Sequence, residues 1–291
     1  MDLQLAGRRA LVTGGSRGIG KAAARALYAE GVQVAIAARS ADRLARAAAD
    51  IAAGVTAADN VAADRVAADR VAADNVAADR ERRVHVITAD TGDDASVRQM
   101  VQRARELMGG VDILVNCAAV PAGQSRPPSL AEITSEAFWS DVNVKVLGYL
   151  RCAQAVAPGM VEAGWGRIIS VSGLAARSTG SIIGSIRNIS VAAMTKNLGD
   201  ELGPHGVNVT VLHPGLTRTE ATEGVVARNA AAAGVGPEDI ERRMARTTTI
   251  GRLITAAEIA HLITFLASPL SVSINGEAIA CGGGAPGVIH Y

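Results

Sequence analysis

A glycine-rich run at residues 13–20, with the sequence TGGSRGIG, is the part of the chain best suited to binding phosphate. It follows an apolar segment and opens a helical one that should run from Gly18 to about Glu30. Gly14 permits a tight turn, Gly18 lets the backbone approach a ligand, and Gly20 lets the helix pack on the strand. The free N–H groups and the dipole at the helix start attract an anion. We therefore expect a site for the pyrophosphate of a dinucleotide, formed by Gly14, Ser16, Arg17, Gly18, Ile19 and Gly20. The alternative is a glycine-rich turn that binds no ligand.

The residues after the second expected strand bear on the choice between NAD and NADP. An Asp or Glu at this point would bind the ribose hydroxyls of NAD, but the chain reads Ala37-Ala38-Arg39-Ser40. Arg39, helped by Arg17 in the glycine loop, can hold the 2′-phosphate of NADP through charged hydrogen bonds. The sequence therefore favours NADP over NAD, with Arg39 and Ser40 as contacts. The alternative is that Arg39 is only a solvated loop charge.

Seven short runs rich in Val, Ile and Ala alternate with longer Ala-rich stretches of helical character. Continuous apolar strands separated by helices are typical of a parallel sheet covered on both faces. The order predicts a single doubly wound α/β domain over residues 1–291, a Rossmann fold with a seven-stranded parallel sheet. The expected strands are 9–13, 32–37, 84–88, 111–116, 166–171, 207–212 and 277–281.

One segment does not follow this alternation. Residues 56–80 consist of five tandem pentads, TAADN-VAADR-VAADR-VAADN-VAADR. A period of five gives neither an apolar stripe on a helix nor a single buried face on a strand. We interpret the pentads as a surface insertion, either a helical extension or a loop. A partner-binding arm is the alternative.

Composition and charge narrow the classes of partner and location. The 291-residue chain has a formal net charge of +1, so it carries neither the basic footprint of a nucleic-acid-binding protein nor a polybasic membrane anchor. No apolar run reaches the roughly 18 residues that cross a bilayer, and the first residues lack a signal-peptide pattern. Cys117, Cys152 and Cys281 lie far apart without metal-ligand spacing, as expected of buried thiols in a reducing cytosol. We expect a cytoplasmic protein that binds a small-molecule substrate or effector and no metal.

Further motifs accompany the glycine loop in a fixed order. Asp90 follows the third expected strand, Asn116-Cys117-Ala118-Ala119 the fourth, and Pro214-Gly215-Leu216-Thr217 the sixth, while Asn143 lies in a helix and residues 275–284 read NGEAIACGGG. Together they resemble the short-chain dehydrogenase/reductase family over nearly the whole chain except the pentads. The resemblance implies a homo-oligomer, a tetramer or dimer, because the tail glycines of family members usually lie at a subunit interface. It also implies cofactor contacts from Asp90, Thr91, Asn116, Ala118, Pro214, Gly215, Thr217 and Thr219.

The resemblance also implies where the acid–base groups should be, and there the chain departs from the family. Family enzymes use Ser, Tyr and Lys, assisted by an Asn. The Tyr exchanges a proton with the substrate oxygen, and the Lys lowers the pKa of the Tyr. Matching the helix before Pro214 through residues 195–198 puts Gly184 at the Tyr position and Asn188 at the Lys position. We therefore expect the pair to be missing, since this helix contains none of the three tyrosines, Tyr28, Tyr149 and Tyr291.

Other polar residues are candidates for what remains of the reaction centre. Ser172 is either a surviving polar group near the family Ser position or a strand-end hydroxyl bonded to its own loop. Asn143 either holds a water or backbone carbonyl or only stabilises a helix bend. Arg187 could hold an acidic substrate, with packing or solvent exposure as the alternative, and His213 is either a proton shuttle or a loop histidine with satisfied hydrogen bonds. Tyr149 is set aside because it follows Asn143 by six residues, roughly 9 Å along a helix.

Two functions fit these observations. The first is an NADP-dependent oxidoreductase with an altered proton donor, acting on a carbonyl, an alcohol or an activated alkene. The second is a non-catalytic NADP(H)-binding sensor or partner subunit, which could lose the acid–base pair without penalty. The segment 219–249 is long enough to form a substrate lid, which favours the first.

Overall fold

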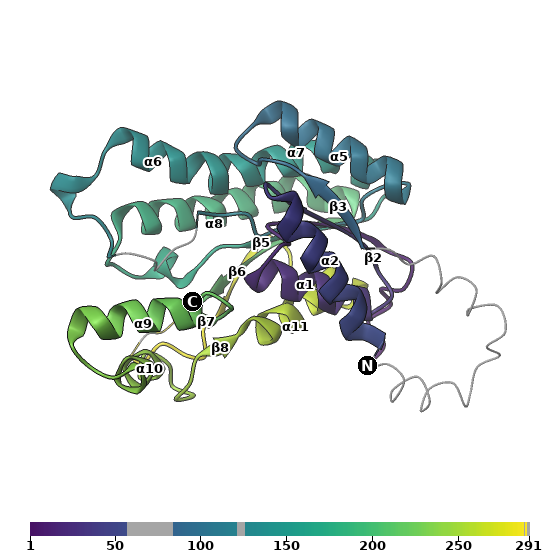
Figure 1. Ribbon diagram of the computed structural model, residues 1–291. Coiled ribbons are helices and arrows are strands. Elements are labelled where there is room, and N and C mark those ends of the chain that lie inside the picture. Colours follow the sequence, from purple (N-terminus) through teal and green to yellow (C-terminus); the bar gives the residue numbers. More distant parts are fainter. Residues whose placement is uncertain (57–83, 121–125, 288, 290–291) are drawn as a thin grey trace.

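The computed structural model describes residues 1–56, 84–120, 126–287 and 289, and the statements below concern these residues. All seven expected strands form, and they make one parallel sheet (Figure 1). Its order is β3-β2-β1-β4-β5-β6-β9, so the chain reverses direction across the sheet between β1 and β4. In sheets of this kind, ligands bind beside that reversal, at the carboxyl ends of the strands. The strands are β1 (Arg9–Thr13), β2 (Gln33–Ala38), β3 (His85–Thr88), β4 (Ile113–Asn116), β5 (Gly166–Val171), β6 (Val207–Pro214) and β9 (Glu277–Cys281).

Helices cover both faces of the sheet, as the continuous apolar strands predicted (Figure 1). One face carries α1 (Gly18–Ala29), α2 (Ala41–Thr56) and α11 (Ala256–Ala267). The other carries α5 (Asp94–Met108), α7 (Gly148–Glu162) and α8 (Ile182–Leu202). Helix α2 ends where the pentads begin. From residue 57 onward the pentads lie outside the described residues, and their interpretation as an insertion stays a prediction.

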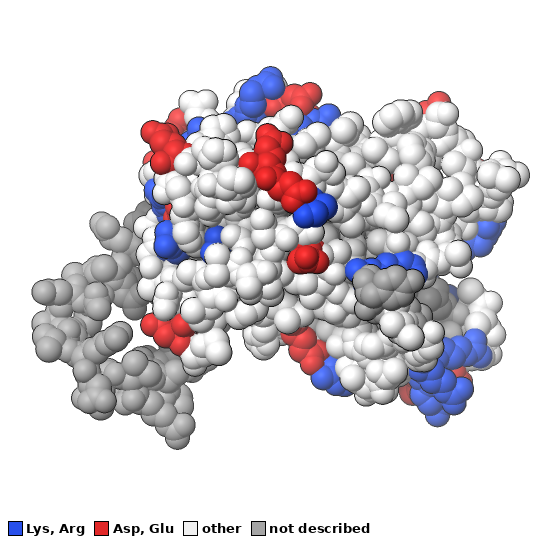
Figure 2. Space-filling model, turned by 180° about the vertical axis from the view of Figure 1, so that it is seen from behind, with Lys and Arg blue, Asp and Glu red and all other residues white. Residues whose placement is uncertain are grey.

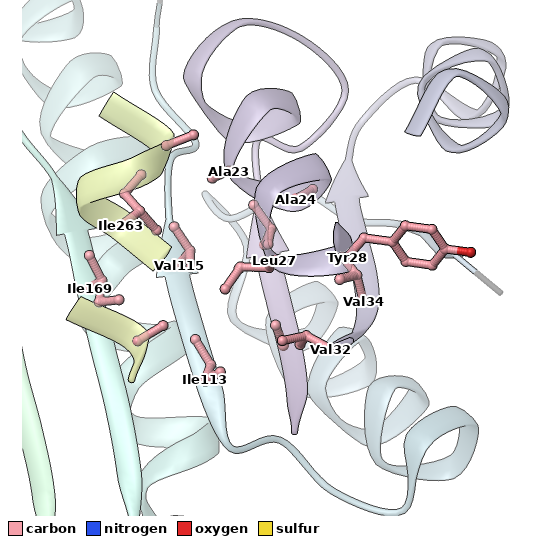
Figure 3. Close-up of a cluster of buried hydrophobic side chains, with 14 of the residues drawn as sticks. Ala23, Ala24, Leu27, Tyr28, Val32, Val34, Ile113, Val115, Ile169 and Ile263 are labelled. Carbon is pink, nitrogen blue, oxygen red and sulfur yellow. The ribbon is translucent and has the colours of Figure 1, made fainter. Parts of the chain in front are cut away.

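Neighbouring strands are in register, so that alternate residues form rows across the sheet. Ile36, Val12, Val115 and Ile169 are successive partners, and all four belong to the core beneath α1 and α11. Figure 3 shows Val115 and Ile169 of this row, with Ala23, Ala24 and Leu27 of α1 and Ile263 of α11 in the same cluster. The next row, Ala35, Leu11, Leu114 and Ile168, faces α5 and α7. This period of two explains why both sets of positions must be apolar.

A long helix is interrupted where it passes the sheet. It begins as α6 (Ser135–Val142), continues through a π-helical turn at Asn143–Leu147, and resumes as α7. The wider turn rotates the side chains after it relative to those before it, and such turns are frequent at functional sites.

Two short strands that the sequence did not predict follow β6. Strands β7 (Thr217–Arg218) and β8 (Ile254–Thr255) form a small parallel pair, and between them lie α9 (Thr222–Ala233) and α10 (Pro237–Ala245). These two helices pack together through Val226, Ala230 and Ile240. Figure 2, which views the opposite face, shows scattered charges of both signs and a group of basic side chains at the corner formed by α9 and α10. No helix in the described part of the chain is long and apolar enough to cross a membrane.

Candidate active site

The glycine loop packs tightly against the segment that follows β4. A Cβ at Gly14, where φ is +66°, would lie 2.8 Å from the backbone nitrogen of Ala118. A Cβ at Gly20 would lie 2.4 Å from the carbonyl oxygen of Gly14. Thr13 Oγ1 accepts a hydrogen bond from the Cys117 amide at 3.2 Å. Backbone atoms cannot move aside cheaply, so glycine is required at both positions, as the motif predicted.

A carboxylate lies at the start of α1, at the expected pyrophosphate site. The Gly18 amide donates to Glu220 Oε2 at 2.9 Å, and the N-cap residue Arg17 makes no side-chain cap. A Cβ at Gly18 would lie only 3.5 Å from Thr219 Cγ2, so the predicted contact Thr219 is next to the loop. The carboxylate occupies the position expected for a phosphate of the cofactor, because it accepts from the same N–H group and lies at the same positive end of the helix dipole. The loop therefore fits the pyrophosphate of a dinucleotide.

The residues expected near the adenosine end line the same edge of the sheet. Arg17 and Arg39 are exposed, and neither guanidinium group makes a hydrogen bond or ion pair with another described residue. Ser40 Oγ accepts weakly from the Arg43 amide at 3.4 Å, and Asp90 Oδ1 accepts from the Gly92 amide at 2.9 Å. The two guanidinium groups are thus available for a phosphate, which fits NADP.

The other predicted cofactor contacts follow β3, β4 and β6. Asn116 is buried, and neither atom of its side-chain amide has a hydrogen-bond partner among the described residues. Thr91 Oγ1 lies 3.4 Å from the carbonyl oxygen of Val144, and Thr217 Oγ1 donates to that of Gly215 at 3.1 Å. Because parallel strands end at one edge, the structure brings these residues to the side where the glycine loop lies. Those contacts are Thr91, Asn116, Ala118, Pro214, Gly215 and Thr217.

The helix expected to carry the acid–base pair, α8, contains no tyrosine, and its single lysine, Lys196, is exposed. The N-cap residue Ser181 accepts from the Gly184 amide at 3.0 Å, and both Gly184 and Asn188 are buried. Ser172 Oγ lies 3.0 Å from the carbonyl oxygen of Asn188 and 3.1 Å from its Oδ1. Ser172 is thus bonded to α8 and not to its own loop. Hence the end of β5 and the middle of α8 form one polar cluster.

Lys145, which no sequence motif marks, completes this cluster. Its Nζ donates to Asn188 Oδ1 at 2.9 Å and to the carbonyl oxygen of Ser172 at 3.0 Å, and the residue is only 4% exposed. Burial, with a smaller contribution from the positive charge of Arg187, lowers the pKa of Lys145 from 10.5 to about 7. Lys145 therefore supplies a titratable group beside Asn188, although Gly184 and Asn188 themselves cannot titrate.

Arg187 is neither exposed nor free to hold a substrate. It is buried, and its Nη1 bonds to Asp141 Oδ1 of α6. The packing alternative is confirmed for this residue. Since Asp141 opposes the effect of Arg187 on Lys145, the ion pair also limits how far the pKa of the amine falls.

Asn143 and Tyr149 point in directions that the sequence did not give. Asn143 Nδ2 donates to the carbonyl oxygen of Gly92 at 2.9 Å, and no bond joins it to Asn188. Tyr149 is fully buried, and its hydroxyl donates to the carbonyl oxygen of Val171 at 3.1 Å. Burial raises its pKa well above 10. The distance between Asn143 and Tyr149 along the helix therefore does not show where the Tyr149 side chain lies. Its hydroxyl reaches Val171 at the end of β5, one residue before Ser172.

His213 and the cysteines show no arrangement for metal binding. His213 is buried at the end of β6, beside Cys281 of the neighbouring strand. Burial raises the pKa of Cys117, Cys152 and Cys281 to about 12, which keeps these thiols protonated. Within the described ranges, no group of three His, Cys, Asp or Glu side chains could hold a metal ion.

Comparison with known proteins identifies the family. A family model described as short chain dehydrogenase matches residues 8–73, and one described as enoyl-(acyl carrier protein) reductase matches residues 58–286, more than half of the chain. The chain belongs to the short-chain dehydrogenase family. The short-chain reductase protein NovJ of Streptomyces niveus is 31% identical over 95% of this chain and 93% of its own length. A sorbitol dehydrogenase of Cereibacter sphaeroides is 29% identical over 97% of this chain and 98% of its own.

Solved structures of the family share the fold. The crystal structure of L-sorbose reductase from Gluconobacter frateurii, complexed with NADPH and L-sorbose, superposes with a TM-score of 0.83 at 24% identity, covering 99% of this chain and 100% of that one. Membership in the short-chain dehydrogenase family and the Rossmann-type sheet are both confirmed, and the named relatives are oxidoreductases.

Proposed function

We propose that this short-chain dehydrogenase is an NADP(H)-dependent oxidoreductase that interconverts a carbonyl compound and its alcohol, at a site with an altered acid–base group. The observation that carries the proposal is the position of the Lys145–Asn188–Ser172 cluster. It lies at the same sheet edge as the glycine loop, whose Gly18 amide already binds a carboxylate. An anion site and a polar, partly titratable cluster are the two parts that a dehydrogenase needs. An activated alkene is a further possible substrate class.

The choice of NADP rests on charge. When bound, the cofactor would supply a hydride, which is the chemistry that this chain's own side chains cannot supply. Its pyrophosphate would lie at the Gly18 amide, and its 2′-phosphate would be held by Arg17 and Arg39, which are exposed and have no described partner. No acid follows β2 to bind the ribose hydroxyls of NAD in their place.

The altered acid–base group rests on the residues of α8. If Gly184 and Asn188 hold the positions of the family Tyr and Lys, neither can donate a proton. A Cβ at Gly173, next to Ser172, would lie 3.4 Å from Asn188 Nδ2, so this residue also faces the cluster without a side chain. The absence of side chains at Gly173 and Gly184 is the observation that favours the second candidate function, a non-catalytic NADP(H)-binding subunit.

Two measurements on the purified protein test both candidate functions. The first is titration with NADPH and with NADH, and the second is NADPH oxidation in the presence of a panel of ketones, ketoacyl thioesters and enones. We expect tighter binding of NADPH than of NADH and turnover of at least one carbonyl. Binding without turnover across the panel would favour the non-catalytic subunit. Failure of both nucleotides to bind would contradict both candidates.

We also propose that the protein is a homo-oligomer. Ile182, Ile186 and Ile189 of α8 are 46%, 41% and 56% exposed, and their spacing places them on one side of the helix. An exposed apolar stripe of this kind is typical of a surface that a second copy covers. Light scattering should give a dimer or larger species, and Ile186→Asp with Ile189→Asp should dissociate it if α8 forms the interface.

A further inference from the structure

Lys145 reaches the cluster from the middle of the π-helical turn at Asn143–Leu147. It lies two residues after Asn143, and in a regular α-helix residues two apart point to nearly opposite sides. The structure shows this divergence, since Asn143 turns to Gly92 while Lys145 turns to Asn188. Tyr149, four residues on, shares the side of Lys145 and bonds to β5. A long cationic side chain from this turn thus bonds to Asn188, the residue expected at the family lysine position.

The hydrogen bonds of the cluster fix the orientation of the Asn188 amide. Its Oδ1 lies 2.9 Å from Lys145 Nζ and 3.1 Å from Ser172 Oγ. With the oxygen engaged, Nδ2 lies on the other side, 3.4 Å from the place where a Cβ of Gly173 would be, and it donates to no described residue. The missing side chain at Gly173 leaves room there for a ligand atom of about that size.

The ammonium group of Lys145 has one donor left. It carries three N–H groups, of which the carbonyl oxygen of Ser172 and Asn188 Oδ1 take two. The charged groups around it come from several elements, namely Arg187 of α8 with its partner Asp141 of α6, and Cys117 after β4. The two on α8 and α6 neutralise each other, so burial decides the behaviour of the amine, and its pKa of about 7 lets it give and take a proton near neutral pH.

We infer that Lys145 is the acid–base residue of this site and that the Asn188 amide holds the substrate oxygen beside it. The inference rests on the proposed oxidoreductase function. In carbonyl reduction the carbonyl carbon would receive the hydride that bound NADPH would supply, and the electron pair of the broken C=O π bond would move to oxygen. That oxygen takes a proton from Lys145 Nζ, whose N–H bond breaks, and the neutral amine regains a proton from water. In alcohol oxidation the neutral amine takes the hydroxyl proton, the C=O bond forms, and bound NADP⁺ would accept the hydride that leaves the carbon.

The ionisation of Lys145 can be measured without cofactor or substrate. The sequence contains three lysines, Lys21, Lys145 and Lys196, so protein labelled with carbon-13 at lysine Cε gives few signals. Lys21 and Lys196 form ion pairs with Asp50 and Asp200, and the bond to Asp200 raises the pKa of Lys196. One signal should titrate near pH 7 and be absent in Lys145→Met. Three signals that all stay charged beyond pH 9, roughly two units above the value expected, would overturn the inference.

Turnover supplies the second test, with Lys196→Met as the matched control on the surface of α8. Lys145→Met should lower kcat by roughly 100-fold or more while NADPH affinity changes by less than about threefold. Lys145→Arg keeps a positive charge but cannot release a proton, so it should lower kcat as much as Lys145→Met does. That result would exclude loss of charge or of folding as the cause of the lower kcat in Lys145→Met. In the wild type, carbonyl reduction should slow and alcohol oxidation should speed up as the pH rises through 7.

The outcomes separate the inference from the function on which it rests. Full kcat in Lys145→Met, with opposite pH trends still present, would overturn the role of Lys145 and leave the oxidoreductase standing. Wild-type protein that binds NADPH but turns over no carbonyl, alcohol or enone would overturn both. A titrating Lys145 signal together with the loss of kcat in both variants would support both.

Discussion

The side-chain nitrogen of Lys145 lies 2.9 Å from Asn188 Oδ1, although 43 residues separate the two in sequence. The contact joins the π-helical turn to the middle of α8, and together with Ser172 it buries an amine at the end of β5. A buried amine is costly to charge, which makes the site sensitive to pH in its stability as well as in its chemistry.

Lys145→Met should change how stability depends on pH. Folding lowers the pKa of Lys145 from 10.5 to about 7, so between these values the unfolded chain binds more protons than the folded one. The wild-type free energy of unfolding should therefore gain up to about 1.4 kcal/mol per pH unit from this residue as the pH rises through the window. The variant should lack that gain. Urea denaturation of both proteins across the window measures the difference, and parallel curves would contradict the burial of a titrating amine.

Asp141→Asn should destabilise the fold and lower the pKa of Lys145 further. It leaves the charge of Arg187 buried without its partner, a change that typically costs about 3–5 kcal/mol. It also removes the negative charge that raises the pKa of Lys145. Denaturation and the carbon-13 lysine titration measure the two effects. As a control, Asp200→Asn breaks the exposed pair with Lys196 and should cost less than about 1 kcal/mol.

Glu220→Gln should tighten NADPH binding. In the cofactor-free protein the Glu220 carboxylate accepts from the Gly18 amide, so it competes with the pyrophosphate for the start of α1. Removing its charge should lower the Kd for NADPH by roughly two- to fivefold. Fluorescence titration measures this, with Glu223→Gln in the first turn of α9 as the control. Weaker binding in Glu220→Gln would mean that this residue helps to hold the cofactor.

Arg39→Ala should remove the preference for NADPH. Loss of a charged hydrogen bond to the 2′-phosphate should raise the Kd for NADPH by roughly 10- to 100-fold and leave that for NADH nearly unchanged. Arg98→Ala, on exposed surface of α5, is the matched control. Equal losses for both nucleotides would instead place Arg39 at a part that the two cofactors share.

Some of this protein could be predicted from the sequence because the requirements are local. Gly14 and Gly20 stand at the spacing that one strand-to-helix turn requires, and the continuous apolar runs specify a sheet buried on both faces. The lack of a tyrosine in α8 is equally a property of the sequence. The distance of Tyr149 from Asn143 along the helix, on which Tyr149 is set aside, says nothing about the direction of its side chain, whose hydroxyl reaches Val171.

Tertiary structure alone decided which side chains meet. Nothing near Lys145 in the sequence marks it as buried, since a lysine is ordinarily exposed and only the π-helical turn and the packing of α8 enclose it. Glu220 and Gly18 are 202 residues apart, and the pairing of Arg187 with Asp141 joins two helices. Such contacts depend on how whole elements pack, whereas the glycine loop can be recognised from the spacing of residues in one short run, although Gly14 also packs against the segment after β4.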